Sequence, residues 1–168
     1  MDDAIRAFGR ECRSILEADA GPQGLDTVRR LLEEQLLSNP DVIKAYLSGP
    51  DDPERNVLDE DPDLGFCIVA HRYRGPHQGR VHDHGPAWAI YGQVTGKIHM
   101  TEYDLLEPPK AGEAGKVKQK KAYDLVAGKA VVYPIGQVHA PNFPETVRVI
   151  RIEGHNLEGV PREKFVAV

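Results

Sequence analysis

The chain has 168 residues, of which 40% are hydrophobic, 28% charged and 7% aromatic. This composition is typical of one soluble domain with its own hydrophobic core, and it argues against two domains. The formal net charge of -5 disfavours a nucleic-acid-binding protein or a protein of the membrane surface. We therefore expect small molecules as partners, and neither nucleic acid nor a membrane.

The sequence carries no sign of a membrane span or a secretion signal. No window approaches the roughly 18 consecutive apolar residues of a span, and the chain begins with the acidic Met1-Asp2-Asp3. We therefore expect a cytoplasmic protein. Cys12 and Cys67 are far apart in apolar settings, which predicts buried, reduced thiols rather than a disulfide.

Three helices are predicted at the start of the chain. Apolar residues recur at helical intervals over residues 2–18. A second apolar stripe follows Asp26, a candidate N-cap, and ends before Asn39. Asn39 is expected to cap a short third helix that has Pro40 in its first position. The pattern predicts a helical segment over residues 1–48 that packs on the rest of the chain.

Residues 49–168 are rich in glycine and proline and are predicted to be mainly β. A polar, acidic connection comes first, and segments of strand type follow at short intervals. The predicted strands are residues 55–58, 65–72, 87–95, 97–106, 117–126, 130–133 and 147–153. Their number and spacing indicate a barrel or a sandwich that forms one structural domain with the helices.

Two of the seven histidines form the motif His82-Asp83-His84. On a strand, residues two apart point to the same face, so the two imidazoles are expected to converge on one metal ion inside a barrel. A third ligand must come from elsewhere, and His139 is the candidate. It ends the pattern Gly128-x5-Pro134-x-Gly136-x2-His139, in which a strand and a tight turn present a histidine on the next strand.

These two blocks resemble the two motifs of the cupins. Gly96 follows the second histidine by twelve positions, as in the first cupin motif, and the 54 residues between His84 and His139 have room for the intervening strands. The resemblance implies a mainly β fold, the cupin double-stranded β-helix or jelly-roll barrel, preceded by N-terminal helices. The first cupin motif also has a glutamate five positions after its second histidine, where this chain has Ala89.

The expected metal ligands are therefore His82, His84 and His139, without a carboxylate. Three neutral imidazoles on a divalent ion leave about three positions of an octahedron open, enough for a bidentate substrate and dioxygen. Iron(II) suits this arrangement best. Zinc, nickel, manganese and copper are alternatives for the same nitrogens, and zinc prefers a tetrahedral site with one water.

A site of three histidines is similar to that of the cysteine dioxygenases, a family of thiol dioxygenases. Members carry an Arg-Asn-Leu-Val type segment some 26 residues before the first metal histidine, and this chain has Arg55-Asn56-Val57-Leu58 at nearly that distance. In that family the arginine binds the substrate carboxylate. The resemblance thus implies that Arg55 binds the substrate, as a guanidinium can grip a carboxylate with two hydrogen bonds.

The chain also departs from that family. The Ser-x-His-x-Tyr strand of the cysteine dioxygenases is matched here by Val149, Arg151 and Glu153, and Ala89 stands in place of the cross-linking cysteine of the animal enzymes. If these positions face inward, Arg151 and Glu153 form a buried or half-buried ion pair beside the metal, or Glu153 is a ligand or a base. The alternative is a pair of surface charges on an edge strand.

Trp88 and Tyr91 follow the histidine pair closely and are candidates for walls of the substrate pocket, with ordinary core positions as the alternative. The leading hypothesis is an iron(II)-dependent dioxygenase that oxidises a small thiol or a chelating carboxylate with dioxygen. One alternative is a zinc or manganese isomerase, lyase or hydrolase with Glu153 as base. The other is a non-catalytic cupin that binds a small ligand. The sequence leaves the oligomeric state open.

Overall fold

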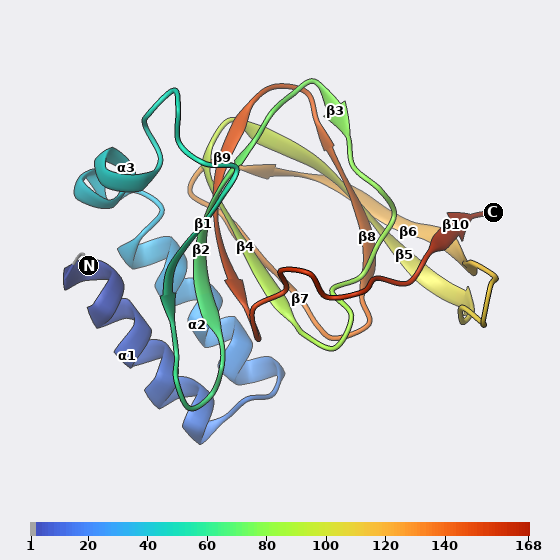
Figure 1. Cartoon of the computed structure of the whole chain (residues 1–168), viewed down its shortest axis with the longest axis horizontal. Helices are drawn as coiled ribbons and strands as arrows, with labels where there is room; N and C mark the ends of the chain where they lie inside the picture. The colour runs from blue at the N-terminus through green and yellow to red at the C-terminus, as the bar shows by residue number, and fades with distance from the viewer. Residues whose placement is uncertain (1–2) are drawn as a thin grey trace.

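The computed structural model describes residues 3–168, so Met1 and the predicted helix start at Asp2 lie outside the described residues. Three helices precede the strands: α1 (Asp3–Ala18), α2 (Pro22–Gln35) and α3 (Pro40–Tyr46). They lie together on one side of a β-barrel (Figure 1). The three predicted helices are confirmed, with one corrected boundary. No helix within residues 3–168 has both the length and the apolar character needed to cross a membrane.

The predicted start of the second helix was wrong. Helix α2 begins at Pro22 with Gly21 as its N-cap, not at Asp26. Asp19, which lies before the helix, accepts hydrogen bonds from the backbone N–H groups of Gly21 (2.7 Å) and Gly24 (3.0 Å). Because this carboxylate pairs a free donor of the first turn, the helix needs no capping side chain at position 21.

The predicted cap of the third helix is confirmed. The side chain of Asn39 accepts from the backbone N–H groups of Asp41 (3.1 Å) and Val42 (3.3 Å). We expect Asn39→Ala to lower the free energy of unfolding by about 1 kcal/mol, because both donors lose their partner. Chemical denaturation measures this change. The neighbouring exposed Ser38→Ala is the control, expected within about 0.5 kcal/mol of the wild type, and equal losses in the two variants would contradict the capping role.

Within the described residues, ten strands form two five-stranded sheets that close into the barrel (Figure 1). The first sheet has the order β1 (Arg55–Glu60), β2 (Cys67–Tyr73), β9 (Val147–Glu153), β4 (Ala89–Thr95) and β7 (Ala130–Tyr133). The second has the order β10 (Phe165–Ala167), β6 (Gly115–Val126), β5 (Lys97–Glu107), β8 (Val138–Phe143) and β3 (His77–Gln78). This is the predicted mainly β, double-stranded β-helix fold with N-terminal helices.

All seven predicted strands are present, and three further strands had no predicted bounds. Strands β3 and β10 are only two and three residues long, too short for an alternating pattern. Strand β8 contains Pro141, a residue that argues against a strand inside a sheet. Its carbonyl oxygen nevertheless accepts from the backbone N–H of Gly79 at 2.8 Å, beside the short strand β3.

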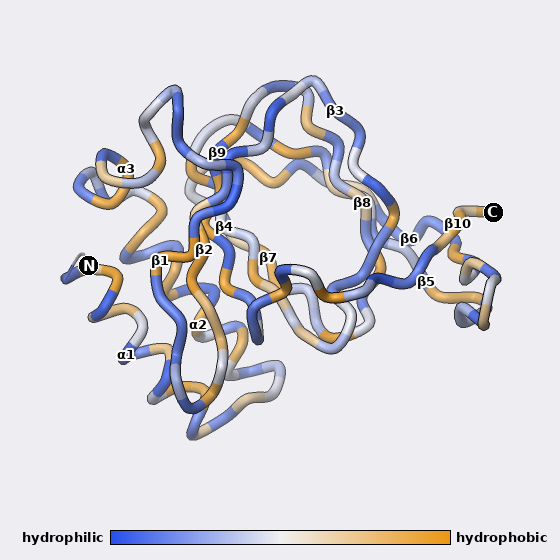
Figure 2. The backbone as a smooth tube through the Cα atoms, in the orientation of Figure 1, coloured by the Kyte–Doolittle hydropathy of each residue, from blue (hydrophilic) through white to orange (hydrophobic). Residues whose placement is uncertain are grey.

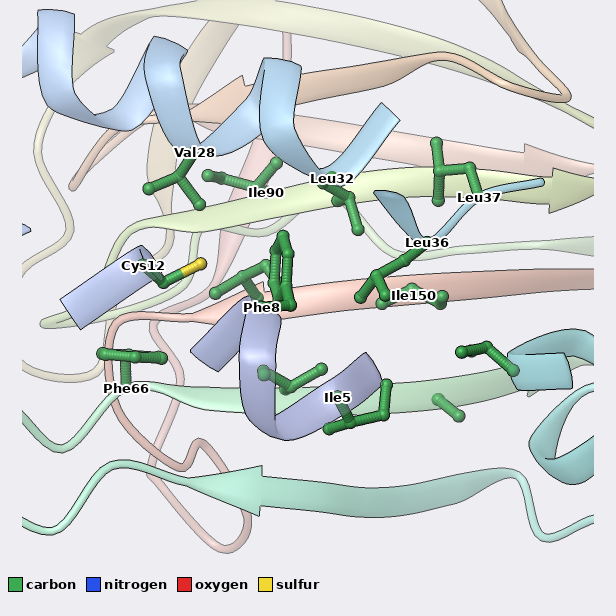
Figure 3. Packing of buried hydrophobic residues seen from close by; sticks show 14 of the residues in the cluster. Ile5, Phe8, Cys12, Val28, Leu32, Leu36, Leu37, Phe66, Ile90 and Ile150 are labelled. Atoms are coloured by element: carbon green, nitrogen blue, oxygen red, sulfur yellow. The ribbon is translucent and has the colours of Figure 1, made fainter. Parts of the chain in front are cut away.

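Two hydrophobic clusters lie on opposite faces of the first sheet. Side chains of α1 and α2 pack against the outer face, and Figure 3 shows Phe8, Val28 and Leu32 close to Ile90 and Ile150 of the sheet. Figure 2 shows hydrophobic residues recurring along the helices between hydrophilic ones, as one buried side requires. The inner cluster fills the barrel and comprises Ala89, Tyr91, Ile98, Met100, Leu125, Tyr133, Phe143, Val147 and Val149.

The two cysteines are buried and free, as predicted. Cys12 lies in the cluster beneath the helices, and burial raises the pKa of its thiol. Burial raises the pKa of Cys67 to about 12, and the neighbouring carboxylate of Glu153 adds to this shift. Both thiols therefore stay protonated at neutral pH.

Alternation along β9 decides which side chains reach the barrel interior. Ile150 and Ile152 belong to the cluster beneath the helices, whereas Val149 belongs to the inner cluster. Residues two apart share a face, so Arg151 and Glu153 point inward with Val149. Arg151 is 8% exposed and Glu153 is fully buried. The inward orientation considered from the sequence is thus the observed one, and these residues are not surface charges on an edge.

Candidate metal centre

His82, His84 and His139 come together inside the barrel. Each offers one ring nitrogen, and these three atoms lie within 4.8 Å of one another. The ring centroid of His139 is 4.5 Å from that of His82 and 4.7 Å from that of His84. Residues separated by more than fifty positions in the sequence therefore form one cluster, as the two motifs predicted.

The local structure that carries the histidine pair differs from the prediction. His139 lies on β8, and His82 joins it through two backbone hydrogen bonds of 2.9 Å in an isolated β-bridge. His84, however, lies in a loop rather than on a strand. The chain turns directly after His84 at Gly85. The φ of Gly85 is 58°, in the left-handed region that glycine adopts at little cost in free energy. The two rings therefore converge without the alternation of a regular strand.

The hydrogen bonds of the rings leave nitrogen atoms free for a cation. Nδ1 of His82 donates to the carbonyl oxygen of Arg80 (2.8 Å), and Nδ1 of His139 donates to that of Gln137 (3.1 Å). Nε2 of each ring is therefore a lone-pair acceptor. In the part of the chain that the structure describes, Nε2 of His139 and Nδ1 of His84 are buried without a hydrogen-bond partner.

All three imidazoles are neutral at pH 7. Burial lowers the pKa of His82 to about 4, and it also lowers those of His84 and His139. Metal ligation requires the neutral ring, and a buried nitrogen without a partner costs free energy. The three residues thus fit a divalent metal ion, and their nitrogen set suits iron, zinc, nickel or manganese.

Two tyrosines, Tyr133 and Tyr123, support the ring of His139. Tyr133 stacks on His139 with ring centroids 3.9 Å apart, and its hydroxyl group lies 2.7 Å from that of Tyr123. The Tyr123 hydroxyl in turn donates to Glu102 at 2.9 Å. These contacts hold the His139 ring in one orientation. Tyr133 comes directly before the Pro134-x-Gly136-x2-His139 pattern, a position that sequence reasoning overlooked.

A cavity of about 410 Å³ opens beside the histidine cluster. Its wall combines aromatic rings and arginines with the histidines. The lining residues include His82, His84, Tyr73, Tyr91, Phe143, Arg80, Arg151, Leu157, Val160 and Arg162. The last three belong to the segment that runs across the end of the barrel between β9 and β10 (Figure 1).

Tyr91 lies in this wall, as predicted. Its hydroxyl oxygen is 3.1 Å from Nε2 of His84. Burial raises the pKa of Tyr91, so the hydroxyl group keeps its proton at neutral pH. The guanidinium group of Arg151 lies 4.7 Å above the Tyr91 ring and donates to the hydroxyl of Tyr73 at 3.0 Å. The positively charged side chain of Arg151 therefore packs against two aromatic side chains in the cavity wall.

Glu153 lies behind Arg151 in a buried ion triad. One carboxylate oxygen is 2.7 Å from Nη2 of Arg151, and Arg55 donates to both oxygens at 2.9 Å. Burial opposes the charge of Glu153, but the attraction of Arg151 and the hydrogen bonds of Arg55 outweigh it, and the pKa is lowered. Two arginines thus share one carboxylate, which gives the triad a net charge of about +1.

The structure separates other predicted site residues from the cavity. Arg55 does not line it. Its Nη2 atom also donates to Asn156 at 2.7 Å, and the residue lines a neighbouring hollow of about 600 Å³. Trp88 lies outside as well, because alternation on β4 directs Ala89 and Tyr91 inward, and it packs against the cluster beneath the helices.

Glu153 also does not line the cavity, and it is not among the residues grouped as metal ligands. Its remaining contacts are the backbone N–H of Leu157 (3.3 Å), the thiol of Cys67 (3.6 Å) and Nε2 of His71 (4.0 Å). Tyr73, Arg80 and Arg162, which do line it, were not singled out from the sequence. No motif connects them, since they come from β2, a loop and the segment after β9.

The fold has remote likenesses among solved structures. A cupin-2 domain protein from Shewanella frigidimarina is 16% identical and aligns over 67% of this chain and 87% of its own, with a TM-score of 0.44. A protein with a double-stranded β-helix domain from Klebsiella pneumoniae is 16% identical over 66% and 80% of the two chains, with a TM-score of 0.46. KdgF from a Halomonas species is 16% identical over 61% and 78%, with a TM-score of 0.43.

No protein-family model matches the sequence, and neither does any curated protein. Cupin-domain proteins are thus among the structural neighbours. This chain has a mainly β, double-stranded β-helix fold with N-terminal helices, and it brings together three histidines that suit a metal ion. At 16% identity the likenesses concern the fold and do not bear on the reaction.

Proposed function

We propose that this protein is a non-haem iron(II)-dependent dioxygenase that oxidises a small thiol or chelating carboxylate with dioxygen. The observation that carries the proposal is a cluster of three neutral imidazoles without a carboxylate, beside a cavity that contains a buried arginine. Iron held by His82, His84 and His139 would supply binding and activation of dioxygen next to the substrate.

Arg151 is the residue that we assign to the substrate carboxylate, in place of Arg55. It lines the cavity, and its Nε atom is buried without a partner in residues 3–168. Burial disfavours its charge, yet its pKa is raised because Tyr73, Tyr91 and Glu153 favour the cation. Arg55 acts indirectly, because it binds the carboxylate of Glu153, which in turn orients Arg151. A buried guanidinium with net positive surroundings binds an anion strongly.

Tyr91 and the apolar wall complete the proposed site. The protonated hydroxyl of Tyr91 faces the cavity and can donate a hydrogen bond to a bound substrate. Phe143, Leu157 and Val160 line the same cavity, and a substrate bound against their apolar side chains would displace water from it. Lower water content strengthens the attraction between Arg151 and a carboxylate, and it limits side reactions of an activated substrate.

The direct test is metal analysis of purified protein, followed by dioxygen uptake of the iron-loaded protein with cysteine, 3-mercaptopropionate and small chelating acids. We expect iron, and oxygen uptake with at least one compound of the panel. Arg151→Gln should raise KM about tenfold or more with bound metal unchanged, since one charge-assisted contact is lost. The exposed Arg74→Gln is the control. Absence of oxygen uptake with every compound would refute the dioxygenase.

A second candidate is Lewis-acid catalysis by a zinc or manganese cupin that acts as an isomerase, lyase or hydrolase. The specific observation in its favour is the buried, protonated hydroxyl of Tyr91 beside the histidine cluster, which can serve as a proton donor. Glu153 is a poor base for such a reaction, because both of its oxygens accept hydrogen bonds from Arg55. Zinc in the purified protein without oxygen uptake would favour this candidate, and absence of metal would favour a ligand-binding cupin.

A further inference from the structure

The cavity beside the histidines has an unusual charge for an acidic protein. Three arginines line it, at positions 80, 151 and 162, and no aspartate or glutamate does. The whole chain has a formal net charge of -5. Positive charge is therefore concentrated at one opening of the molecule, where it favours the entry of anions.

Two of these arginines are free of carboxylates. Elsewhere Arg13, Arg29 and Arg148 form ion pairs with acidic side chains. Within residues 3–168, by contrast, no carboxylate lies within ion-pair distance of Arg80 or Arg162. Arg162 donates to the backbone carbonyl of Asp83 at 2.6 Å, and this hydrogen bond holds its guanidinium beside the histidine pair. The Asp83 carboxylate is turned to the backbone N–H of Gly85 (3.0 Å) and does not line the cavity.

The three cations lie at different depths. Arg151 is 8% exposed and lines the inner end of the cavity, while its partners Glu153 and Arg55 lie behind it and outside the cavity lining. Arg162 is half-buried on the segment that crosses the end of the barrel, and Arg80 is exposed at the mouth. One anionic group at Arg151 leaves the two outer guanidinium groups without a counter-charge. A small molecule with a single carboxylate thus satisfies only the inner part of the site.

We infer that the substrate carries two anionic groups, of which Arg151 binds the inner one and Arg80 and Arg162 bind the outer one. This inference rests on the proposed function of the cavity and makes its substrate class more specific. The chemical class is a small dianion, such as a dicarboxylic acid or a phosphorylated carboxylic acid. The volume of about 410 Å³ suits a molecule of this size. Arg80 and Arg162 are specificity-determining residues, because they distinguish the dianion from the corresponding monoanion.

Malate and lactate test this assignment, since both are chelating hydroxy acids and malate has one more carboxylate. Calorimetric titration of the protein with its native metal should give malate an affinity about tenfold or more above that of lactate. Arg162→Gln should weaken malate binding about tenfold and leave lactate binding within about twofold. Arg80→Gln should also weaken malate binding, but by a smaller factor, because the charge of an exposed side chain is screened by solvent.

Lys164→Gln is the matched control, because it removes one positive charge from the same segment at an exposed position that does not line the cavity. Its malate affinity should equal that of the wild type. Equal binding of malate and lactate by the wild type, or equal losses in Arg162→Gln and Lys164→Gln, would overturn the assignment. If Arg162→Gln fails to fold, Arg80→Gln alone decides, because its exposed side chain has no structural partner in residues 3–168. Binding is measured without dioxygen, so failure of the dioxygenase proposal is seen separately, in the uptake assay.

Discussion

Replacement of Glu153 by glutamine is expected to lower the free energy of unfolding by about 3–5 kcal/mol, although the two side chains have nearly the same shape. The carboxylate is fully buried and contacts Arg151 at 2.7 Å and Arg55 at 2.9 Å. A neutral amide leaves two guanidinium groups close together without a counter-charge, and its N–H₂ group meets donors where an acceptor is required. Chemical denaturation of wild type and variant at pH 7 measures the difference.

Glu102→Gln provides a matched control for this loss. Glu102 is 7% exposed, but its only cationic contact within residues 3–168 is Lys121 at 3.3 Å, on an exposed side chain. The loss of this contact should cost about 1 kcal/mol or less, since the amide oxygen of glutamine can still accept the hydrogen bond of Tyr123. If Glu153→Gln costs no more than Glu102→Gln, the triad is not the stabilising arrangement that we describe.

The pH dependence of stability gives an independent check on Glu153. Its pKa in the folded protein is lowered from the ordinary value of 4.5. A carboxylate with a lowered pKa contributes its full stabilisation above the unfolded value and loses it as the pH falls through the folded value. The difference in stability between wild type and Glu153→Gln should therefore be constant at neutral pH and shrink below about pH 4.5. A difference that grows toward acid pH would contradict the lowered pKa.

His82→Ala is expected to weaken metal binding by more than about 100-fold, since loss of a direct ligand exceeds the 10–100-fold effect of losing its supporting contacts. His82 is the most accessible of the three histidines, so its removal disturbs packing least. Metal content after dialysis against a weak chelator measures the loss, and the folded state is verified by thermal unfolding of the metal-free proteins. Dioxygen uptake, if present in the wild type, should disappear together with the metal.

His155→Gln is the control for the histidine prediction. His155 is half-buried and lies outside the cluster of three. This variant should retain the metal content of the wild type. Retention of metal by His82→Ala would show that the cluster is not the metal site, and an equal loss in both variants would point to a general effect on folding.

Local features of the chain were predictable because their causes lie within a few residues. Apolar spacing marks the helices, and Asn39 caps α3 through donors only two and three positions away. Alternation and the intervening glycines mark the seven strands whose bounds were predicted. The second cupin motif predicted the position of His139 for a related reason, since the turn at Gly136 lies just before the strand that carries this histidine.

Predictions failed where a contact with a residue outside the predicted element decides the outcome. The start of α2 depends on Asp19 rather than on a residue of the helix. Strand β3 exists only through its pairing with β8. Arg55 matched a sequence segment of a known family, but its partner Glu153 lies 98 positions away and directs it away from the cavity.

The sequence by itself determined the helices, most strands, the cupin fold and the three histidines, because these follow from periodicity and short motifs. Only the tertiary structure decided that Arg151 faces the cavity, whereas Arg55 is paired with the carboxylate of Glu153 outside it. The register between β2, β9 and β4 sets Arg151 between Val69 and Tyr91, and the segment after β9 brings Arg162 to Asp83. Such pairings depend on strand order and on side-chain direction in a closed sheet, and neither is encoded by neighbours in the sequence.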